Sequence, residues 1–238
     1  MPGMKNSLIL LYIFFTAIVL IAFACKKEAV VHTPVDYSFS EEFDTVGNSV
    51  ARGWVIANNT KPIGTASWKQ GIFYYENKKG TGDGFGALNA SYSGTDFIMT
   101  SVDCGFGAAN CSNWLISPEM TAKNGDSISF YTRTYESPAV AADRLEVRLN
   151  SVNGSSDVGT DSNSIGNFNT LLLDINPELL LSGAAAYPGT WTKYTAVVSG
   201  IPEARKTRVG FRYYIPNGGP AGKNGLGVGI DKFQFISN

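Results

Sequence analysis

Two carboxylates stand in apolar rows of predicted strands, where a charged side chain needs a partner. Glu41 alternates with Phe39 and Phe43, so a regular strand places all three on one face. Near the C-terminus, Asp231 alternates in the same way with Phe233. If the first and last strands of the domain are neighbours, the two carboxylates meet in a poorly solvated place and need a counterion.

Calcium is the counterion that this pattern favours. Ca²⁺ takes about 6–8 oxygen ligands, and Glu41 and Asp231 would supply part of the set, with backbone carbonyls and an Asn or Asp completing it. We expect such a Ca²⁺ to be structural. In the alternative interpretation a β-bulge turns Glu41 outward and Asp231 caps a turn, or Lys232 pairs with a carboxylate.

Cys25 ends a segment with the pattern of an export signal. An apolar run over residues 8–24 follows Lys5, and the sequence AFAC at 22–25 has small residues on both sides of its one bulky residue. This ending resembles the bacterial lipoprotein box, in which the cysteine receives a diacylglyceryl group and becomes the mature N-terminus. An uncleaved spanning helix is the alternative, but about 17 residues is the short limit for crossing a bilayer.

The other two cysteines, Cys104 and Cys111, form an even pair in an exported protein. Exported proteins keep disulfides, so we predict a disulfide that closes the short glycine-containing loop between them. Two free thiols on a metal are the alternative. Zinc is disfavoured because there is no further cysteine and the only histidine, His32, precedes the predicted domain.

Aromatic side chains are the candidates for ligand binding, because sugar rings stack on flat exposed aromatics through their C–H faces. The candidates are Trp68, Tyr74 and Tyr75, followed by Tyr92 and Tyr135. Burial in the core or at a sheet edge is the competing interpretation for each of them. The remaining tryptophans, Trp54, Trp114 and Trp191, are flanked by apolar positions and are expected to fill the core.

Composition and residue counts argue against several functions. The 19 Lys and Arg nearly balance the 20 Asp and Glu, which gives no electrostatic footprint for nucleic acid. One histidine outside the domain excludes a histidine-based triad, and pairing of Cys104 with Cys111 would remove a cysteine nucleophile. A glycosidase needs two carboxylates about 5–10 Å apart across a cleft, and no local spacing of Asp and Glu residues in the sequence indicates such a pair.

The elements that must position these residues are β-strands. Apolar and polar residues alternate at 128–130, 145–149 and 209–213, which predicts strands with one solvated face each. Glycine- and asparagine-rich turns follow at 124–126, 153–155 and 217–220. Residues 151–167 are polar and predict a long surface loop, and only residues 176–180 suggest a short helix.

We therefore predict an all-β chain, an antiparallel two-sheet jelly-roll sandwich preceded by an N-terminal signal/lipoprotein helix. The predicted segments are a lipoprotein signal peptide at 1–24, a lipidated cysteine with a flexible tether at 25–36, and one β-domain at 37–238. The tether reaches at most roughly 35 Å.

An ordered set of short motifs covers nearly all of residues 37–238. The motifs are FSEEFD at 39–44, Gly53-Trp54, Trp68, ALNASY at 87–92, NWLISP at 113–118, GDSISF at 125–130, DRLEV at 143–147, GTWTKY at 189–194, VGFRY at 209–213 and GIDKF at 229–233. Together they resemble the choice-of-anchor J family, which is related to cleaved-adhesin and MAM-like domains. The resemblance implies an extracellular jelly roll, often with structural calcium and usually without assigned activity, in envelope proteins of Bacteroidetes-like bacteria.

The function expected from these features is that of a non-catalytic cell-envelope lipoprotein with an adhesin-like binding module. Its partners would be the membrane, through the lipid, and a glycan or an envelope protein. The alternatives are an accessory subunit of an outer-membrane complex and, third, a carboxylate-based glycosidase. No aspartate follows Cys25 as an inner-membrane signal, so the outer membrane is the expected location, on either its cell-surface or its periplasmic side.

Overall fold

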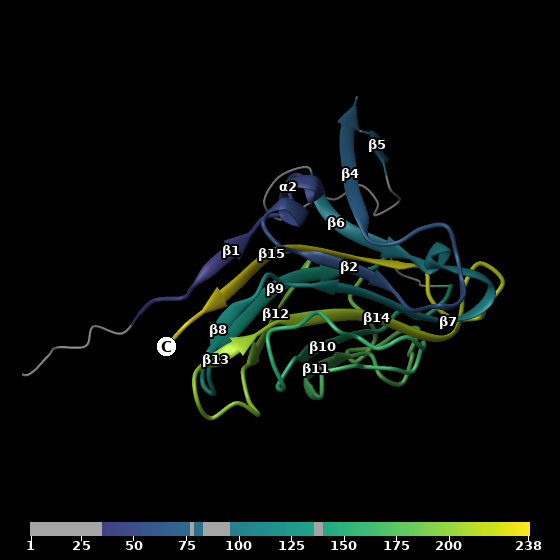
Figure 1. The fold of residues 1–238 in the computed structure, drawn as a ribbon. Coiled ribbons are helices and arrows are strands. Elements are labelled where there is room, and N and C mark those ends of the chain that lie inside the picture. Colours follow the sequence, from purple (N-terminus) through teal and green to yellow (C-terminus); the bar gives the residue numbers. More distant parts are fainter. Residues whose placement is uncertain (1–34, 77–78, 83–95, 136–139) are drawn as a thin grey trace, which may run out of the picture. The chain divides into compact units, whose positions relative to one another are not determined.

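Two large antiparallel sheets face each other in the computed structural model of this chain (Figure 1). The structure describes residues 35–76, 79–82, 96–135 and 140–238. One compact unit extends from Asp36 to Asn238. The predicted signal peptide and most of the predicted tether, including Cys25, lie outside the described residues. Within the described ranges, no helix has the length and apolar character needed to span a membrane.

The first sheet has seven strands in the order β12-β9-β15-β6-β4-β5, with β1 paired to β15. Its strands are β1 (Phe39–Glu41), β4 (Lys69–Glu76), β5 (Lys79–Gly82), β6 (Asp96–Ser101), β9 (Ser127–Arg133), β12 (Thr192–Val197) and β15 (Gly227–Ile236). The strand order shows that segments distant in sequence are hydrogen-bonded neighbours, as the jelly-roll prediction requires.

The second sheet has six strands in the order β11-β10-β14-β7-β2, with β3 paired to β7. Its strands are β2 (Val55–Asn58), β3 (Lys61–Ile63), β7 (Gly105–Ile116), β10 (Leu145–Leu149), β11 (Thr170–Ile175) and β14 (Val209–Gly218). A small two-stranded sheet pairs β8 (Met120–Ala122) with β13 (Arg205–Thr207), and the described helices are α2 (Val46–Ala51) and the 3₁₀ turn η1 (Val102–Cys104). The predicted fold class is confirmed.

The core lies between the sheets and is built from the alternate residues of their strands. Phe130 of β9 and Phe211 of β14 come from different sheets, and their ring centroids are 4.9 Å apart at an interplanar angle of 77°. Phe211 also contacts Phe233 of β15, with the ring centroids 5.9 Å apart. Such edge-to-face pairs are favourable, so the aromatic residues hold the two layers together.

The outer face of the six-stranded sheet is less exposed than the alternation predicts. Trp114 of β7 points away from the inter-sheet core, yet it is fully buried because Phe168 packs on it with ring centroids 5.4 Å apart. Val158 joins the same small cluster. The segment between β10 and β11, predicted as a surface loop, therefore covers this face of the sheet.

Two local predictions differ from the structure. Residues 176–180 form a turn rather than a helix: Asn176 has a positive φ of 59°, and its side-chain oxygen accepts a hydrogen bond from Leu180 N at 2.8 Å. This side-chain bond competes with helical backbone bonds. Conversely, the six-residue helix α2 was not expected, and it leads into Arg52, which contacts Glu41.

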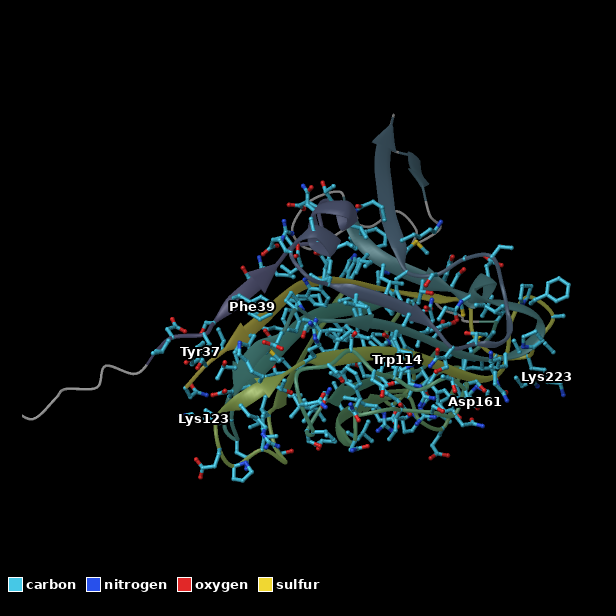
Figure 2. The ribbon with its side chains drawn as sticks, viewed as in Figure 1. Tyr37, Phe39, Trp114, Lys123, Asp161 and Lys223 are labelled. Atoms are coloured by element: carbon cyan, nitrogen blue, oxygen red, sulfur yellow. The ribbon has the colours of Figure 1, made fainter. Side chains whose placement is uncertain are left out.

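The described unit has two distinct ends. Phe39 of β1 pairs with Phe235 of β15, so the chain enters beside its own C-terminus (Figure 1). Figure 2 shows Tyr37 and Phe39 at this end and Lys223, in the connection from β14 to β15, at the other. We call the Lys223 end the distal end.

Candidate functional site

An open cleft lies at the distal end, where the connection from β11 to β12 passes the end of β9. Its volume is about 370 Å³. Three tyrosines, Tyr135, Tyr187 and Tyr194, contribute to its lining together with Thr134 and Thr192, and the rest comes from small and apolar residues within 181–189. None of the described lining residues carries a charge, so the cleft presents aromatic rings, hydroxyls and backbone groups.

Tyr187 forms a fixed part of the cleft wall. Its hydroxyl lies 2.7 Å from Thr132 Oγ1, which itself donates a 2.6 Å hydrogen bond to the Gly229 carbonyl. Because a threonine hydroxyl has one proton, the bond between the two hydroxyls must use the tyrosine proton. Burial raises the pKa of Tyr187 well above its ordinary value, so the phenol remains a donor. Its ring lines the cleft while its polar atom is satisfied inside.

Tyr194 is more exposed than Tyr187. It is half-buried and stacks on Phe130, with ring centroids 6.1 Å apart and an interplanar angle of 22°. The two residues are directly opposite each other in the β9–β12 pair, with Phe130 in the core and Tyr194 contributing to the cleft lining. Tyr135, at the end of β9, also packs against the outer-face pair Phe97 and Met99. Sequence reasoning named Tyr135 but missed Tyr187 and Tyr194, for which the Pro-Gly turn between two tyrosines was the available signal.

A buried carboxylate lies directly behind Thr134. Asp143 Oδ2 accepts a 2.5 Å hydrogen bond from Thr134 Oγ1, and Oδ1 accepts from Tyr213 OH at 2.7 Å. The backbone N–H groups of Leu226 and Gly227 also donate to Oδ1, at 2.9 and 3.1 Å. Burial raises the pKa of Asp143 to about 6, although these hydrogen bonds act in the opposite direction. Asp143 thus fixes the cleft wall to the start of β15.

The two carboxylates predicted to hold calcium are both buried, but they do not face the same side of the sheet. Glu41 pairs with Phe233, whose side chain is in the core. A bulge between Asp231 and Gln234, with Lys232 at a φ of 50°, changes the alternation of β15. Ile230 and Phe233 both point into the core, so Asp231, next to Ile230, points to the outer face. The expectation that Asp231 shares a face with Phe233 and meets Glu41 is wrong.

Glu41 already has a counterion in Arg52. The guanidinium contacts both carboxylate oxygens, with Nη2 2.5 Å from Oε1 and Nε 3.1 Å from Oε2. Asp231 Oδ1 accepts a hydrogen bond from Lys232 N at 2.8 Å. No group of three or more His, Cys, Asp or Glu side chains that could hold a metal occurs among the described residues. Glu41 and Asp231 therefore do not fit a shared calcium site, and calcium binding elsewhere stays a prediction.

Of the three aromatic residues predicted to bind a ligand, Trp68 is buried, and the side chains of Tyr74 and Tyr75 are not described. Trp68 is only 4% exposed, and its indole N–H donates to the Asn113 carbonyl at 3.2 Å. A buried ring has no free face for a sugar, so its assignment as a ligand contact is wrong. Tyr74 and Tyr75 lie in β4, in the hairpin with β5 that projects from the sandwich in Figure 1, but their side chains lie outside the described part of the structure.

Cys104 and Cys111 lie side by side at the distal end. Both are buried free thiols, and a hydrogen bond to Cys111 raises the pKa of Cys104, with burial acting in the same direction. The chain doubles back between them, since a Cβ added to Gly105 would lie 2.6 Å from the Ala109 Cβ. The predicted pairing of these two residues remains a prediction.

Comparison with known proteins identifies the fold. The K1 cleaved adhesin domain of Lys-gingipain from Porphyromonas gingivalis W83 matches with a TM-score of 0.52 and 18% identity, over 84% of this chain and 98% of that chain. The K2 cleaved adhesin domain of Lys-gingipain matches with a TM-score of 0.51 and 16% identity, also over 84% and 98%. No protein-family model and no curated protein matches the chain. The chain therefore has the fold of these cleaved adhesin domains, and the choice-of-anchor J assignment stays a prediction.

Proposed function

We propose that this chain is a non-catalytic binding module of the bacterial cell envelope, anchored through a lipid on Cys25, whose ligand is a glycan or a protein. The observation that carries the proposal is the open, tyrosine-lined cleft at the distal end of the domain. The adhesin name of the two matching Lys-gingipain domains supports a binding role. The lipoprotein ending at Cys25 and the choice-of-anchor J resemblance support the envelope location.

The cleft is also suited to binding rather than to hydrolysis. Glycoside hydrolysis needs a proton donor and a second carboxylate on either side of the bond to be cleaved. The described lining contains neither. Asp143 is the carboxylate behind the wall, and the side chains and backbone around it take up both of its oxygens.

The proposal is tested with the full-length chain solubilised in detergent. It is applied to a glycan array and, in parallel, to a pull-down from intact envelopes of the source bacterium. We expect saturable binding to a glycan or to one protein. Absence of saturable binding in both assays, with the chain shown to be folded by its thermal melt, would contradict the proposed function.

An accessory role in an outer-membrane complex is the second candidate, and two exposed apolar residues at the distal end favour it. Ile63 of β3 pairs with Gly105 of β7, the residue before Phe106. Ile63 is 59% exposed and Phe106 is 71% exposed, so both apolar side chains are accessible to a partner. This candidate would be favoured if the chain binds no glycan but captures a stoichiometric protein partner, and if Phe106→Asp abolishes that capture.

A further inference from the structure

We infer that the distal cleft binds a short, uncharged saccharide, with one sugar ring stacked on Tyr194. This inference rests on the proposed binding function and narrows its ligand to one chemical class. It depends on the size of the cleft, the chemistry of its wall and the charges around it.

The size of the cleft suits a chain end or a short oligosaccharide. Small-molecule pockets commonly measure about 300–1,000 Å³, and the volume here, about 370 Å³, is at the small end of that range. About one or two sugar rings fill such a volume. A protein ligand would need a much larger contact surface, roughly 800 Å² per partner, than this cleft provides.

The wall combines an aromatic face with hydroxyls, which is the combination that a sugar ring requires. Tyr194 is packed on Phe130 on one side and lines the cleft on the other. The face of an aromatic ring carries partial negative charge, which favours contact with the C–H face of a pyranose. Thr192 Oγ1 donates to the Thr190 carbonyl at 3.0 Å, so its lone pairs remain as acceptors for a sugar hydroxyl.

The wall is also preorganised, which reduces the ordering needed on binding. Tyr187 is held by its hydrogen bond to Thr132 and is only 7% exposed. The Thr134 backbone N–H donates to the Pro188 carbonyl at 2.8 Å, which fixes the 181–189 segment against the end of β9. The ring of Tyr194 packs on that of Phe130, its partner on the neighbouring strand β9. The aromatic surface is therefore in place before a ligand arrives.

The charges around the cleft disfavour an acidic sugar. The described lining offers no cation, and the carboxylate of Asp143 lies one side chain behind Thr134. Arg133 and Lys193 directly adjoin lining residues in the sequence. Strand alternation directs the Arg133 side chain to the face opposite Thr134, and the Lys193 side chain to the face opposite Thr192 and Tyr194. A uronic or sialic acid would thus place its carboxylate beside Asp143 without a partner, which is unfavourable.

The test compares neutral and acidic saccharides on the full-length chain in detergent. The neutral probes are gluco-, galacto- and manno-configured oligosaccharides, and the acidic probes are the same chains carrying a uronic or sialic acid. We expect at least one neutral probe to bind. Its acidic form should bind with an affinity at least about tenfold lower. Tyr194→Ala should weaken binding about tenfold or more, whereas Tyr194→Phe keeps the ring and should retain it.

Two further variants keep the test decisive, because Tyr194 also supports Phe130. Ala184→Trp adds a bulky ring from the exposed part of the lining and should block the cleft without disturbing the core. Tyr37→Ala is the matched control, since Tyr37 is a 43% exposed tyrosine at the opposite end of the domain, and its removal should leave binding unchanged.

Preferred binding of acidic probes, or neutral binding that survives both Tyr194→Ala and Ala184→Trp, overturns the inference while the binding function stands. A saturable envelope protein without any glycan binding has the same consequence. Absence of any ligand overturns the inference together with the proposed function.

Discussion

At the scale of single residues, the most consequential group is Asp143, which is fully buried with hydrogen-bond donors on both oxygens. Its folded-state pKa of about 6 lies above the ordinary value of 3.8, so the folded protein holds this proton more tightly than the unfolded chain does. The resulting stabilisation is complete below about pH 4 and is lost as the pH rises through about 6. A shift of this size corresponds to about 3 kcal/mol.

The substitution Asp143→Asn is expected to remove this pH dependence. An asparagine oxygen still accepts the three Oδ1 hydrogen bonds, and its amide can donate to Thr134 Oγ1 while that hydroxyl donates to the Gly227 carbonyl, 2.9 Å away. The variant should match the parent near pH 4 and be more stable by up to about 3 kcal/mol at pH 8. Denaturant unfolding at several pH values measures this, and a stability difference that does not vary with pH would contradict it.

Glu41 and Asp231 show what sequence could and could not predict about single residues. Both carboxylates are buried. The apolar neighbours of Glu41 predict its burial, whereas Asp231 is buried on the outer face, which the alternation of apolar residues did not predict. Their relative orientation depends on one extra residue in β15, the bulge at Lys232, which reverses the faces downstream. A bulge has no reliable local signal when its positive-φ residue is not glycine. The contact between Arg52 and Glu41 could not be predicted from the strand pattern either, because helix α2 brings Arg52 to Glu41 from outside the strand.

At the scale of elements, a buried ion cluster joins β10 to β14 under the covering segment. Burial acts to raise the pKa of Glu146, but the guanidiniums of Arg144, Arg148 and Arg212 keep it below its ordinary value. Glu146 Oε2 is 2.6 Å from Arg148 Nε and 3.2 Å from Arg212 Nη1. The Arg212 guanidinium also lies over the Tyr214 ring, 3.9 Å from its centroid.

Substitution Glu146→Gln should therefore destabilise the fold by about 3–5 kcal/mol, because it leaves buried guanidiniums without their carboxylate. Glu119→Gln is the matched control. Glu119 contacts Lys206 at 3.0 Å, but the two side chains are 41% and 66% exposed, so its loss should cost less than about 1 kcal/mol. Chemical denaturation of the two variants gives the comparison, and similar losses would show that the buried cluster contributes no more than a surface pair.

The segment that contains the cysteines is the second element with a testable consequence. A disulfide between Cys104 and Cys111 would close a short loop and contribute about 2–3 kcal/mol by restricting the unfolded chain. We expect the exported protein to lose that stability on reduction, and its unfolded form to show no alkylatable thiol before reduction. A variant with both Cys104→Ala and Cys111→Ala should not respond to reductant. Two free thiols in the exported protein would refute the pairing.

The strands were easier to predict from the sequence than the segments that cover their outer faces. Strands β9, β10 and β14 contain the alternating stretches that predicted them, because the period-two pattern depends only on which face is buried. The same pattern could not show that the polar face of β10 and β14 is covered, since Phe168 and Val158 reach it from a polar segment. The cleft was missed for a related reason: β9, β12 and the 181–189 segment meet only in the folded chain.

At the scale of the whole molecule, the cleft and the chain entry lie at opposite ends of one strand. Phe235 of β15 pairs with Phe39 near the entry, whereas Gly229 pairs with Arg133, and the Gly227 carbonyl lies 2.9 Å from Thr134 Oγ1 beside the cleft. Phe235 and Gly227 are eight residue steps apart along β15, roughly 26 Å. A domain anchored at its entry end would therefore carry the cleft on the end away from the attachment point, as a binding module requires.

This arrangement has a function only if the chain is anchored, so lipidation of Cys25 is the prediction on which the whole-molecule interpretation depends. Two or more acyl chains hold a protein stably on a membrane, whereas one binds only marginally. We expect the expressed protein to incorporate labelled palmitate and to sediment with outer-membrane vesicles, and Cys25→Ala to abolish both. Cys104→Ala is the matched control and should keep the label. A wild-type chain without label, or label that survives Cys25→Ala, would mean that the domain is held by another segment or not held at all, and the orientation of the cleft would then carry no functional meaning.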